Sequence, residues 1–372
     1  MVEISNGMKF SCVKETLERA VLIAERFTGK NLNLPVLSSI LFEADEDNLL
    51  VTATNLEAAV KIVIPGRGQK KGRAAIPAKI FSSLIQSIND ERVDLEEKQG
   101  NVFIKTSSRD VRVNGIPPDD FPLFPKIKKA GSFTAEGLEL GKGLEKVLPA
   151  VSASEFKPEL NGINFKVFGT RLYLAATDTF RLAEKIVTLR EKVEGGNVSF
   201  ILPQRVAQEV GRVFGGEEEV KVSLGENQII FEAEKITMIS RLIDGNFPEY
   251  SGIVPKEFDV TAFINKRELN DAVRSSSIFS SKLQEISLKF KAKELEINSL
   301  NQEVGEYKTS IPVSTTGSSV SLNFNYKYLL DGVNVLDEEE IFMGLNSEQK
   351  PSLLRNKEDN SFLYCLMPIR LS

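Results

Sequence analysis

Acidic residues abound in this sequence, but the residue combinations that commonly carry catalysis are missing. Histidine is absent from the 372 residues, which removes the commonest general base, Ser/His and Cys/His nucleophile pairs and most zinc sites. Cys12 and Cys365 lie in apolar strand-like stretches, so we expect two buried free thiols, with a disulfide or a reactive thiol as the alternative. No Walker-type phosphate loop, paired-carboxylate motif or cysteine cluster occurs. The sequence therefore predicts a protein that is not an enzyme and needs no cofactor or metal.

The charge and hydropathy of the chain indicate in which compartment it works and what it can bind. The net charge of −5 excludes a uniformly basic nucleic-acid binder, although a locally basic surface stays open. A hydrophobic content of 41% and a charged content of 27% are ordinary for a soluble globular protein. No run of about 18 apolar residues and no signal-peptide pattern is present. We therefore expect a cytoplasmic protein with no membrane partner.

A hairpin pattern occurs three times along the chain. Residues 171–186 alternate apolar and polar side chains on both sides of a polar turn, which is typical of two half-buried strands. Residues 49–60 repeat this pattern 123 residues earlier, and residues 295–306 repeat it more weakly. The weaker copy places Ser299 with Thr177, an offset of 122 residues. The offsets predict three tandem repeats of roughly 120 residues each.

Each repeat has the same order of elements. Pro77 and Pro203 both begin a predicted helix and lie 126 residues apart. Each repeat contains a helix, three or four strands, a second helix and three or four further strands. This order predicts an α+β fold of three similar domains, each with two helices packed on two antiparallel sheets. The predicted divisions are a tail at 1–7 and domains at 8–128, 129–255 and 256–372.

The order and spacing of short motifs resemble the bacterial sliding clamps, the beta subunits of DNA polymerase III. The resemblance covers the chain from Met8 to Leu371. Its most specific motifs are Leu34-Pro35-Val36-Leu37, Leu160-Asn161-Gly162, Ala176-Thr177-Asp178 with Arg181-Leu182-Ala183, Leu242-Ile243-Asp244-Gly245 with Phe247-Pro248-Glu249-Tyr250, and Met367-Pro368-Ile369-Arg370-Leu371. The resemblance implies a homodimer whose chains join head to tail, so that six domains close a ring with helices around the hole. Such a ring encircles double-stranded DNA and needs no contact with base edges.

The resemblance also implies a set of protein partners. They are the replicative DNA polymerase alpha subunit, the clamp loader and other proteins that carry a clamp-binding motif. Each would place a short hydrophobic peptide in a groove between the second and third repeats, where apolar walls and a pliable methionine accept Leu or Phe anchors. Carried over to this chain, the groove consists of Leu160, Thr177, Thr179, Phe180, Arg181, Leu182, Pro248, Ile253, Leu366, Met367, Pro368 and Ile369. Ordinary strand packing is the alternative for Met367 and Ile369.

The groove departs from the family pattern at two places. Thr179-Phe180 stands where the family commonly has Gly-His, and Gly252 stands where it commonly has Arg. Phe180 would enlarge the apolar wall and remove a polar edge, which changes the preferred peptide. The departure leaves an alternative function open, in which the chain is a divergent clamp-like adaptor that binds partner peptides without encircling DNA.

The predicted helices carry the cations that would face DNA. Their charges sum to +3, which leaves −8 for the remainder of the chain; an arbitrary partition of a mixed-charge chain is the alternative explanation. The family carries an arginine on the loop after the first helix, where Asn31 stands here with Lys30 beside it. The DNA-facing candidates are Lys30, Lys79, Lys142, Lys146, Arg205, Arg212, Lys266, Arg267, Arg274 and Lys327.

The joint of the implied ring would lie between the first repeat of one chain and the third repeat of the other. Val111 and Val113 on an edge strand would meet Ile278 and Phe279 of the second chain, because exposed edge strands tend to pair. A local apolar plug within the monomer is the alternative for Ile278 and Phe279.

Overall fold

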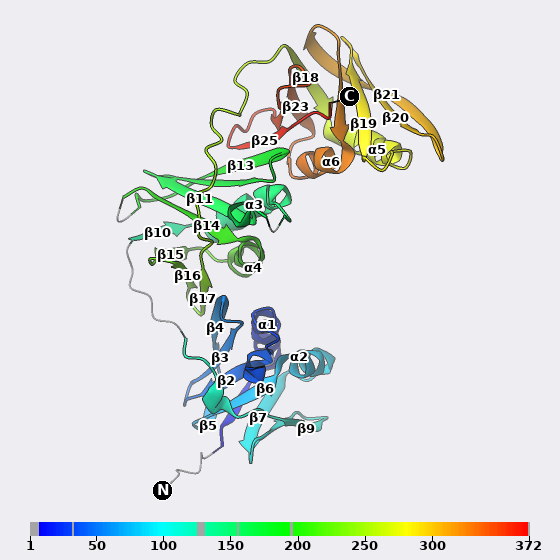
Figure 1. Cartoon of the computed structure of the whole chain (residues 1–372). Helices are drawn as coiled ribbons and strands as arrows, with labels where there is room; N and C mark the ends of the chain where they lie inside the picture. Colours follow the sequence, from blue (N-terminus) through cyan, green and yellow to red (C-terminus); the bar gives the residue numbers. More distant parts are fainter. Residues whose placement is uncertain (1–6, 32, 125–130, 155, 194–195, 371–372) are drawn as a thin grey trace. The chain divides into compact units, whose positions relative to one another are not determined.

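The computed structural model describes residues 7–31, 33–124, 131–154, 156–193 and 196–370 (Figure 1). Most of the predicted tail at 1–7, the predicted boundary after residue 128 and the terminal Leu371 lie outside the described residues. The chain divides into two compact units, Met1–Thr134 with Glu217–Arg241 and Ala135–Gly216 with Leu242–Ser372. Each unit therefore contains strands from more than one sequence repeat.

The first unit packs two helices on two sheets. Its elements are β1 (Lys9–Val13), α1 (Lys14–Glu25), η1 (Pro35–Ser38), β2 (Ser39–Ala44), β3 (Asn48–Thr54), β4 (Ala58–Pro65), β5 (Arg67–Lys70), β6 (Gly72–Pro77), α2 (Ala78–Ser87), β7 (Arg92–Lys98), β8 (Asn101–Lys105), β9 (Asp110–Asn114), η2 (Pro118–Asp120), β10 (Gly131–Ala135), β15 (Val220–Leu224), β16 (Gln228–Ala233) and β17 (Ile236–Arg241). The strands form a sheet in the order β5-β1-β7-β8-β9 and another in the order β10-β15-β16-β17-β4-β3-β2-β6. Helix α1 packs on α2 and on β3 and β4 (Figure 1), and it buries Leu17, Val21 and Ala24 there.

The second unit has four helices and a long sheet. Its elements are α3 (Gly137–Val147), η3 (Leu148–Ala150), η4 (Pro158–Leu160), β11 (Gly162–Phe168), β12 (Arg171–Thr177), β13 (Arg181–Thr188), β14 (Val198–Pro203), α4 (Gln204–Phe214), β18 (Val260–Asn265), α5 (Lys266–Ser277), β19 (Glu285–Phe290), β20 (Glu294–Asn301), β21 (Gly305–Gly317), β22 (Val320–Asn325), α6 (Tyr326–Asn334), β23 (Glu340–Leu345), β24 (Ser352–Asn356) and β25 (Phe362–Leu366). The strand order is β14-β11-β12-β13-β25-β24-β23-β18-β21-β20-β19-β22. Helices pack in pairs, α3 with α4 and α5 with α6.

The three predicted hairpins are present as β3–β4, β12–β13 and β20–β21. The first two hairpins share one turn. The Thr54 hydroxyl donates to the Ala58 carbonyl oxygen (3.0 Å), and the Thr177 hydroxyl donates to the Arg181 carbonyl oxygen (2.6 Å). In both turns the third residue has a positive φ, 76° at Leu56 and 79° at Thr179. Non-glycine residues rarely adopt this conformation, so the side-chain bonds hold the turn in place.

The alignment of the third hairpin differs by one residue from the sequence prediction. Leu295, Ile297 and Ser299 are the buried residues of β20, whereas the corresponding buried face of β12 ends at Ala176. Ser299 therefore corresponds to Ala176 and not to Thr177, and the offset is 123 residues, as between the first two copies. A slip of one residue moves every side chain to the opposite face of a strand, so burial decides the alignment.

Candidate peptide-binding groove and helix surfaces

An apolar cavity of about 180 Å³ lies in the second unit where β13 pairs with β25. The Met367 N–H donates to the Phe180 carbonyl oxygen (2.9 Å), which extends the pairing of these strands to the rim of the cavity. The lining residues are Thr177, Thr179, Phe180, Arg181, Leu182, Pro248, Tyr250, Ile253, Pro351, Cys365, Leu366 and Met367. Most of the residues predicted for the groove therefore lie together.

Arg181 is the cationic side chain of this lining, and two carboxylates bind its guanidinium group. Its Nε donates to Asp178 (2.9 Å), and its Nη1 donates to Asp331. Burial by itself lowers the pKa of Arg181, but Tyr364, Asp331 and Asp178 outweigh burial and raise the pKa above its ordinary value. The guanidinium group thus stays charged, and two carboxylates neutralise it before any ligand arrives.

Phe180 lines the cavity and belongs to an aromatic cluster with Tyr328. The Phe180 side chain is 60% exposed and stacks on Tyr328, with the ring centroids 6.5 Å apart. The Arg181 guanidinium lies over the same Tyr328 ring, 4.2 Å from its centroid. The Tyr364 hydroxyl donates to the Tyr328 carbonyl oxygen (2.8 Å), which ties the backbone of this tyrosine to β25. The Phe180 ring therefore offers apolar surface to the cavity that suits an aromatic or aliphatic anchor.

Sequence reasoning missed three lining residues, Tyr250, Pro351 and Cys365. The Tyr250 hydroxyl donates to Glu184, and burial followed by the Glu184 charge raises the pKa of Tyr250. Burial also raises the pKa of Glu184, although the bond from Tyr250 opposes this effect. Tyr250 belongs to the segment Phe247-Pro248-Glu249-Tyr250 that the resemblance singled out, and this motif was a usable signal.

Three predicted groove residues do not line the cavity. Leu160 is buried at the end of η4, and Pro368 is also buried. The Ile369 N–H donates to the Asn323 carbonyl oxygen, which ties this residue to β22. Packing and backbone pairing engage these three residues beside the cavity, and their place in the groove stays a prediction.

The predicted DNA-facing cations are mostly exposed on the helices. The exposed residues are Lys30, Lys79, Lys142, Arg205, Arg212, Arg267, Arg274 and Lys327. Two of these arginines form ion pairs on their own helix. The Arg212 Nη1 lies 2.8 Å from the Glu209 Oε1, and the Arg267 Nε lies 3.9 Å from the Asp271 Oδ2. Lys266 is partly buried, and its ammonium group donates to the carbonyl oxygens of Asn334 and Leu336.

Lys146 does not belong to this exposed set. Its side chain is buried, with 7% of the residue exposed, and it forms an ion pair with Asp337. Its ammonium group also lies 5.4 Å from the centroid of the Phe362 ring. The prediction that Lys146 faces DNA was wrong, because this lysine points into the protein and not outward from α3.

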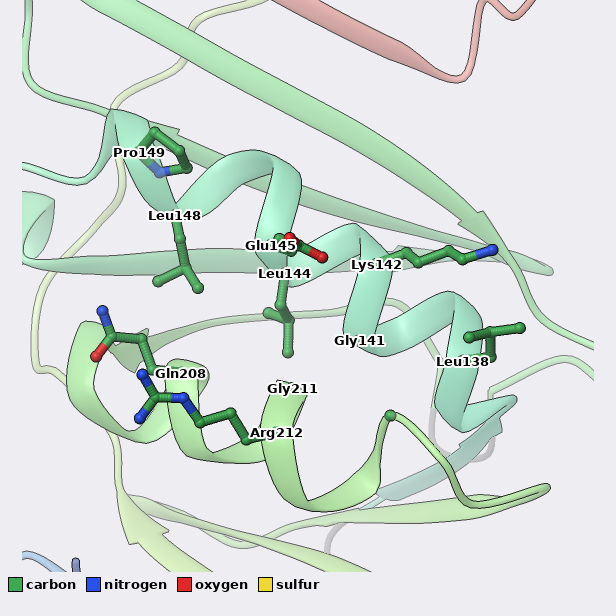
Figure 2. A pocket seen from close by; sticks show the side chains of 11 residues that line it. Leu138, Gly141, Lys142, Leu144, Glu145, Leu148, Pro149, Gln208, Gly211 and Arg212 are labelled. Atoms are coloured by element: carbon green, nitrogen blue, oxygen red, sulfur yellow. The ribbon is translucent and has the colours of Figure 1, made fainter. Parts of the chain in front are cut away.

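The surface of α3 and α4 holds a shallow cavity of about 640 Å³ (Figure 2). Glycines bring the two helices close together: a Cβ added at Gly141 would lie 3.0 Å from the Gly215 Cα and 3.3 Å from the Gly211 carbonyl oxygen. Figure 2 shows Leu144 and Leu148 pointing from α3 towards α4, while Lys142 extends away from α4.

The residues predicted for the ring joint fall into two environments. Val113 is buried and Val111 is partly buried on β9, which is the edge strand of its sheet. Ile278 is exposed at the end of α5, and Phe279 stacks on Tyr307 with the ring centroids 5.8 Å apart.

In the part of the chain that the structure describes, no group of three or more potential ligands could hold a metal ion, and no helix is long and apolar enough to span a membrane. Cys12 and Cys365 are buried and free, which confirms the expected thiols. Burial raises the pKa of each thiol to about 12, so both stay protonated and unreactive.

Comparison with known proteins identifies the family of this chain. Three family models match in succession: the N-terminal domain of the DNA polymerase III beta subunit at residues 8–125, its central domain at 136–249 and its C-terminal domain at 251–370. The chain therefore belongs to the DNA polymerase III beta subunit family.

Individual relatives agree with this assignment. A beta sliding clamp of Bacillus subtilis is 26% identical over 377 residues, which cover 98% of this chain and 100% of the relative. One from Staphylococcus epidermidis is 26% identical over 350 residues, 91% of this chain and 92% of the relative.

Solved structures show the same fold. The DNA polymerase III beta subunit of Thermotoga maritima has a TM-score of 0.92 at 24% identity, covering 98% of this chain and 100% of that one. A Pseudomonas aeruginosa sliding clamp bound to griselimycin has a TM-score of 0.93 at 24% identity, with the same coverage.

Proposed function

We propose that the chain is a DNA sliding clamp. Two copies close head to tail into a ring around double-stranded DNA, and partner proteins dock through a short apolar peptide at the β13–β25 cavity. The observation that carries this proposal is the apolar cavity itself, which lies in a chain matched by all three domains of the beta subunit family. The protein would act by tethering and not by catalysis.

The chemistry of the cavity supports peptide docking. Phe180, Pro248, Ile253 and Met367 offer apolar surface of several shapes, and an adaptable methionine suits more than one anchor. The partners that fit this site are the replicative polymerase, the clamp loader and other proteins with a clamp-binding motif. The relative bound to griselimycin gives a precedent for a ligand on a protein of this fold.

The helix surfaces support loose contact with DNA. Exposed cations are spread over the helices α1 to α6 and the loops that flank them, where they alternate with Glu and Asp side chains. A sparse set of this kind attracts phosphates without fixing a register, which a sliding ring requires. A protein that acts on bacterial chromosomal DNA works in the cytoplasm.

The remaining site assignments follow from the same proposal. Val111 and Val113 of one copy would pack near Ile278 and Phe279 of the other, and the domains would divide at residues 128 and 255. The edge position of β9 and the exposure of Ile278 support this joint.

Light scattering at micromolar concentration tests the proposal. A closed ring of two chains has a mass near twice 41.3 kDa. A chain that stays at 41.3 kDa when it is concentrated would contradict the ring and leave a peptide-binding adaptor.

A further inference from the structure

We propose that two copies of this chain join in one specific strand register, which opposite charges select. In this register Glu306 on β21 lies opposite Arg112 of the partner subunit, and Lys308 lies opposite Asp110 of the partner subunit. The inference rests on the proposed ring and assigns the residues of its joint.

The topology within the chain predicts which strands meet. In the first unit β4 pairs antiparallel with β17, and in the second unit β13 pairs antiparallel with β25. Each pairing joins the second strand of a hairpin to the last strand of the following repeat. The third hairpin ends in β21, and the last strand of the first repeat is β9. The same rule therefore pairs β21 of one copy with β9 of another.

Both strands have an edge available for this pairing. Strand β9 is the last strand of its five-stranded sheet. Strand β21 pairs with β20 along residues 305–312, but β18 covers its other edge only from Val313 to Gly317. Among the described strands, residues 305–310 of β21 thus have one unpaired edge, which is the state that favours strand addition.

The hairpins fix the equivalent residues on β21. Ala59 pairs with Thr54 in the first hairpin, and Leu182 pairs with Thr177 in the second. Because Ser299 corresponds to Ala176, the next residue Leu300 corresponds to Thr177, and Leu300 pairs with Glu306. Glu306 is therefore the equivalent of Ala59 and Leu182.

Isolated backbone bridges fix the equivalent residues on β9. Ile116, Ile243 and Ile369 each form one such bridge, to Ala75, Ile201 and Asn323 respectively. Counting four residues back from each isoleucine gives Arg112, Ile239 and Cys365. These three residues are therefore equivalent on the last strands of the three repeats.

The register follows from the two joints that are present. Ala59 lies opposite Ile239, and Leu182 lies opposite Cys365. The equivalent pair at the third joint is Glu306 with Arg112 of the partner subunit. Continuing along the antiparallel strands, Tyr307 meets the partner's Val111, and Lys308 meets the partner's Asp110.

The charges along β9 and β21 agree with the register that the backbone pairing predicts. Glu306, Lys308, Arg112 and Asp110 are all exposed, and each opposed pair combines a carboxylate with a cation. Asp110 already lies 3.3 Å from Lys105 in its own chain, so Lys308 would join an existing ion pair. Opposite charges directly across a strand pair stabilise it, and like charges destabilise it.

The same charges disfavour the neighbouring registers. A slip of two residues in one direction places Glu306 opposite Asp110, and a slip in the other direction places Lys308 opposite Arg112. A slip of one residue turns Tyr307, which stacks on Phe279, towards a charged side chain in place of Val111. The charges on the two strands therefore stabilise the proposed register and destabilise the neighbouring registers.

Cysteine cross-linking tests the register on the full-length chain. The variant with Arg112→Cys and Glu306→Cys places the two sulfurs across the joint at a spacing that antiparallel pairs and disulfides share. Mild oxidation should give a covalent species of twice 41.3 kDa on a non-reducing gel, since the native thiols are buried. The matched control, Arg112→Cys with Lys308→Cys, is two residues out of register and should cross-link at least about tenfold less.

Charge reversal gives an independent measurement. Arg112→Glu should raise the dimer dissociation constant about tenfold at low salt, because both joints of the ring then oppose two carboxylates. Adding Glu306→Arg to the same chain should restore the affinity, and the difference should shrink in high salt.

The outcomes separate this inference from the proposed ring. A wild-type chain that is monomeric overturns the proposed function. A stable dimer that cross-links equally or better in the control register overturns the register alone, as does a disulfide that leaves the mass at 41.3 kDa. A dimer that is indifferent to the charge reversal also overturns the inference.

Discussion

At the residue level, the groove combines a neutralised cation with exposed aromatic surface. Asp178 and Asp331 engage the Arg181 guanidinium group, so this side chain is already paired before a ligand carboxylate could bind it. Phe180 offers exposed aromatic surface to the cavity, and its ring stacks on Tyr328. Because Phe180 is apolar and Arg181 is already neutralised, the groove should select peptides by apolar shape more than by charge.

Truncation of Phe180 should weaken peptide binding. We expect Phe180→Ala to raise the Kd of an apolar docking peptide about tenfold, equivalent to about 1.4 kcal/mol. Fluorescence anisotropy with a labelled peptide measures this change. Phe168→Ala is the matched control, because Phe168 is similarly exposed but does not line the cavity. An equal loss in both variants, or no loss at Phe180, would contradict the place of Phe180 in the groove.

Lys142 and Lys146 both lie on α3, but we expect only Lys142 to contribute to DNA binding. Lys142→Ala should lower the salt dependence of DNA binding by roughly one phosphate contact per chain, whereas Lys146→Met should leave it unchanged.

Asp337→Asn should instead cost about 1–3 kcal/mol of stability, since it leaves the buried Lys146 ammonium group without its carboxylate. Salt titrations of duplex binding and thermal melts separate these effects. A DNA-binding defect in Lys146→Met would return this residue to the DNA-facing set.

At the level of elements, close packing of helices depends on glycine at one crossing. Gly141 of α3 faces Gly211 and Gly215 across the contact with α4, so backbone meets backbone. Glycine lowers helix propensity by about 1 kcal/mol relative to alanine, and this cost is tolerated here because a larger side chain would separate the helices.

Gly141→Ala should therefore destabilise the protein although alanine favours helix. Overpacking costs typically 1–3 kcal/mol, which exceeds the gain in propensity, so we expect a lower thermal midpoint. Gly216→Ala serves as the control, because a Cβ at Gly216 meets no atom within 4 Å. A melting temperature that rises for Gly141→Ala would show that the helices can move apart without cost.

Most elements could be predicted from the sequence because apolar periodicity directly reflects which face of an element is buried. The hairpins at 49–60 and 171–186 follow from alternation alone. The alignment of Ser299 could not be predicted, because the polar residues of the third hairpin conceal which face is buried. Lys146 was misplaced for a related reason: its partner Asp337 is far along the chain, and helix charge counts do not include it.

The groove was only partly predictable for a similar reason. Thr179, Phe180 and Arg181 are adjacent in sequence, so the family motif identifies them together. Pro351 and Cys365 enter the cavity only because β13 pairs with β25 and strands of the third repeat fold beside it. Leu160, Pro368 and Ile369 come from the family motifs alone and do not line the cavity, so their role in the groove stays a prediction.

At the level of the whole molecule, function depends on closure and not on any single contact. Each repeat leaves one strand edge for the next repeat, and the chain alone leaves β9 and the first part of β21 unpaired among its described strands. A second copy would complete both edges. Exposed cations on the helices would then need only to attract phosphates weakly, because topology retains the ring on DNA.

Retention on circular DNA tests this account most directly. The protein is loaded by a clamp loader with ATP onto a nicked circular plasmid and separated from free protein at high salt, and the plasmid is then linearised. The account predicts that the clamp stays with the circle and is lost from the linear molecule, because a sliding ring leaves over a free end. Equal retention on circular and linear DNA, or no salt-resistant retention at all, would contradict the claim that this chain encircles DNA.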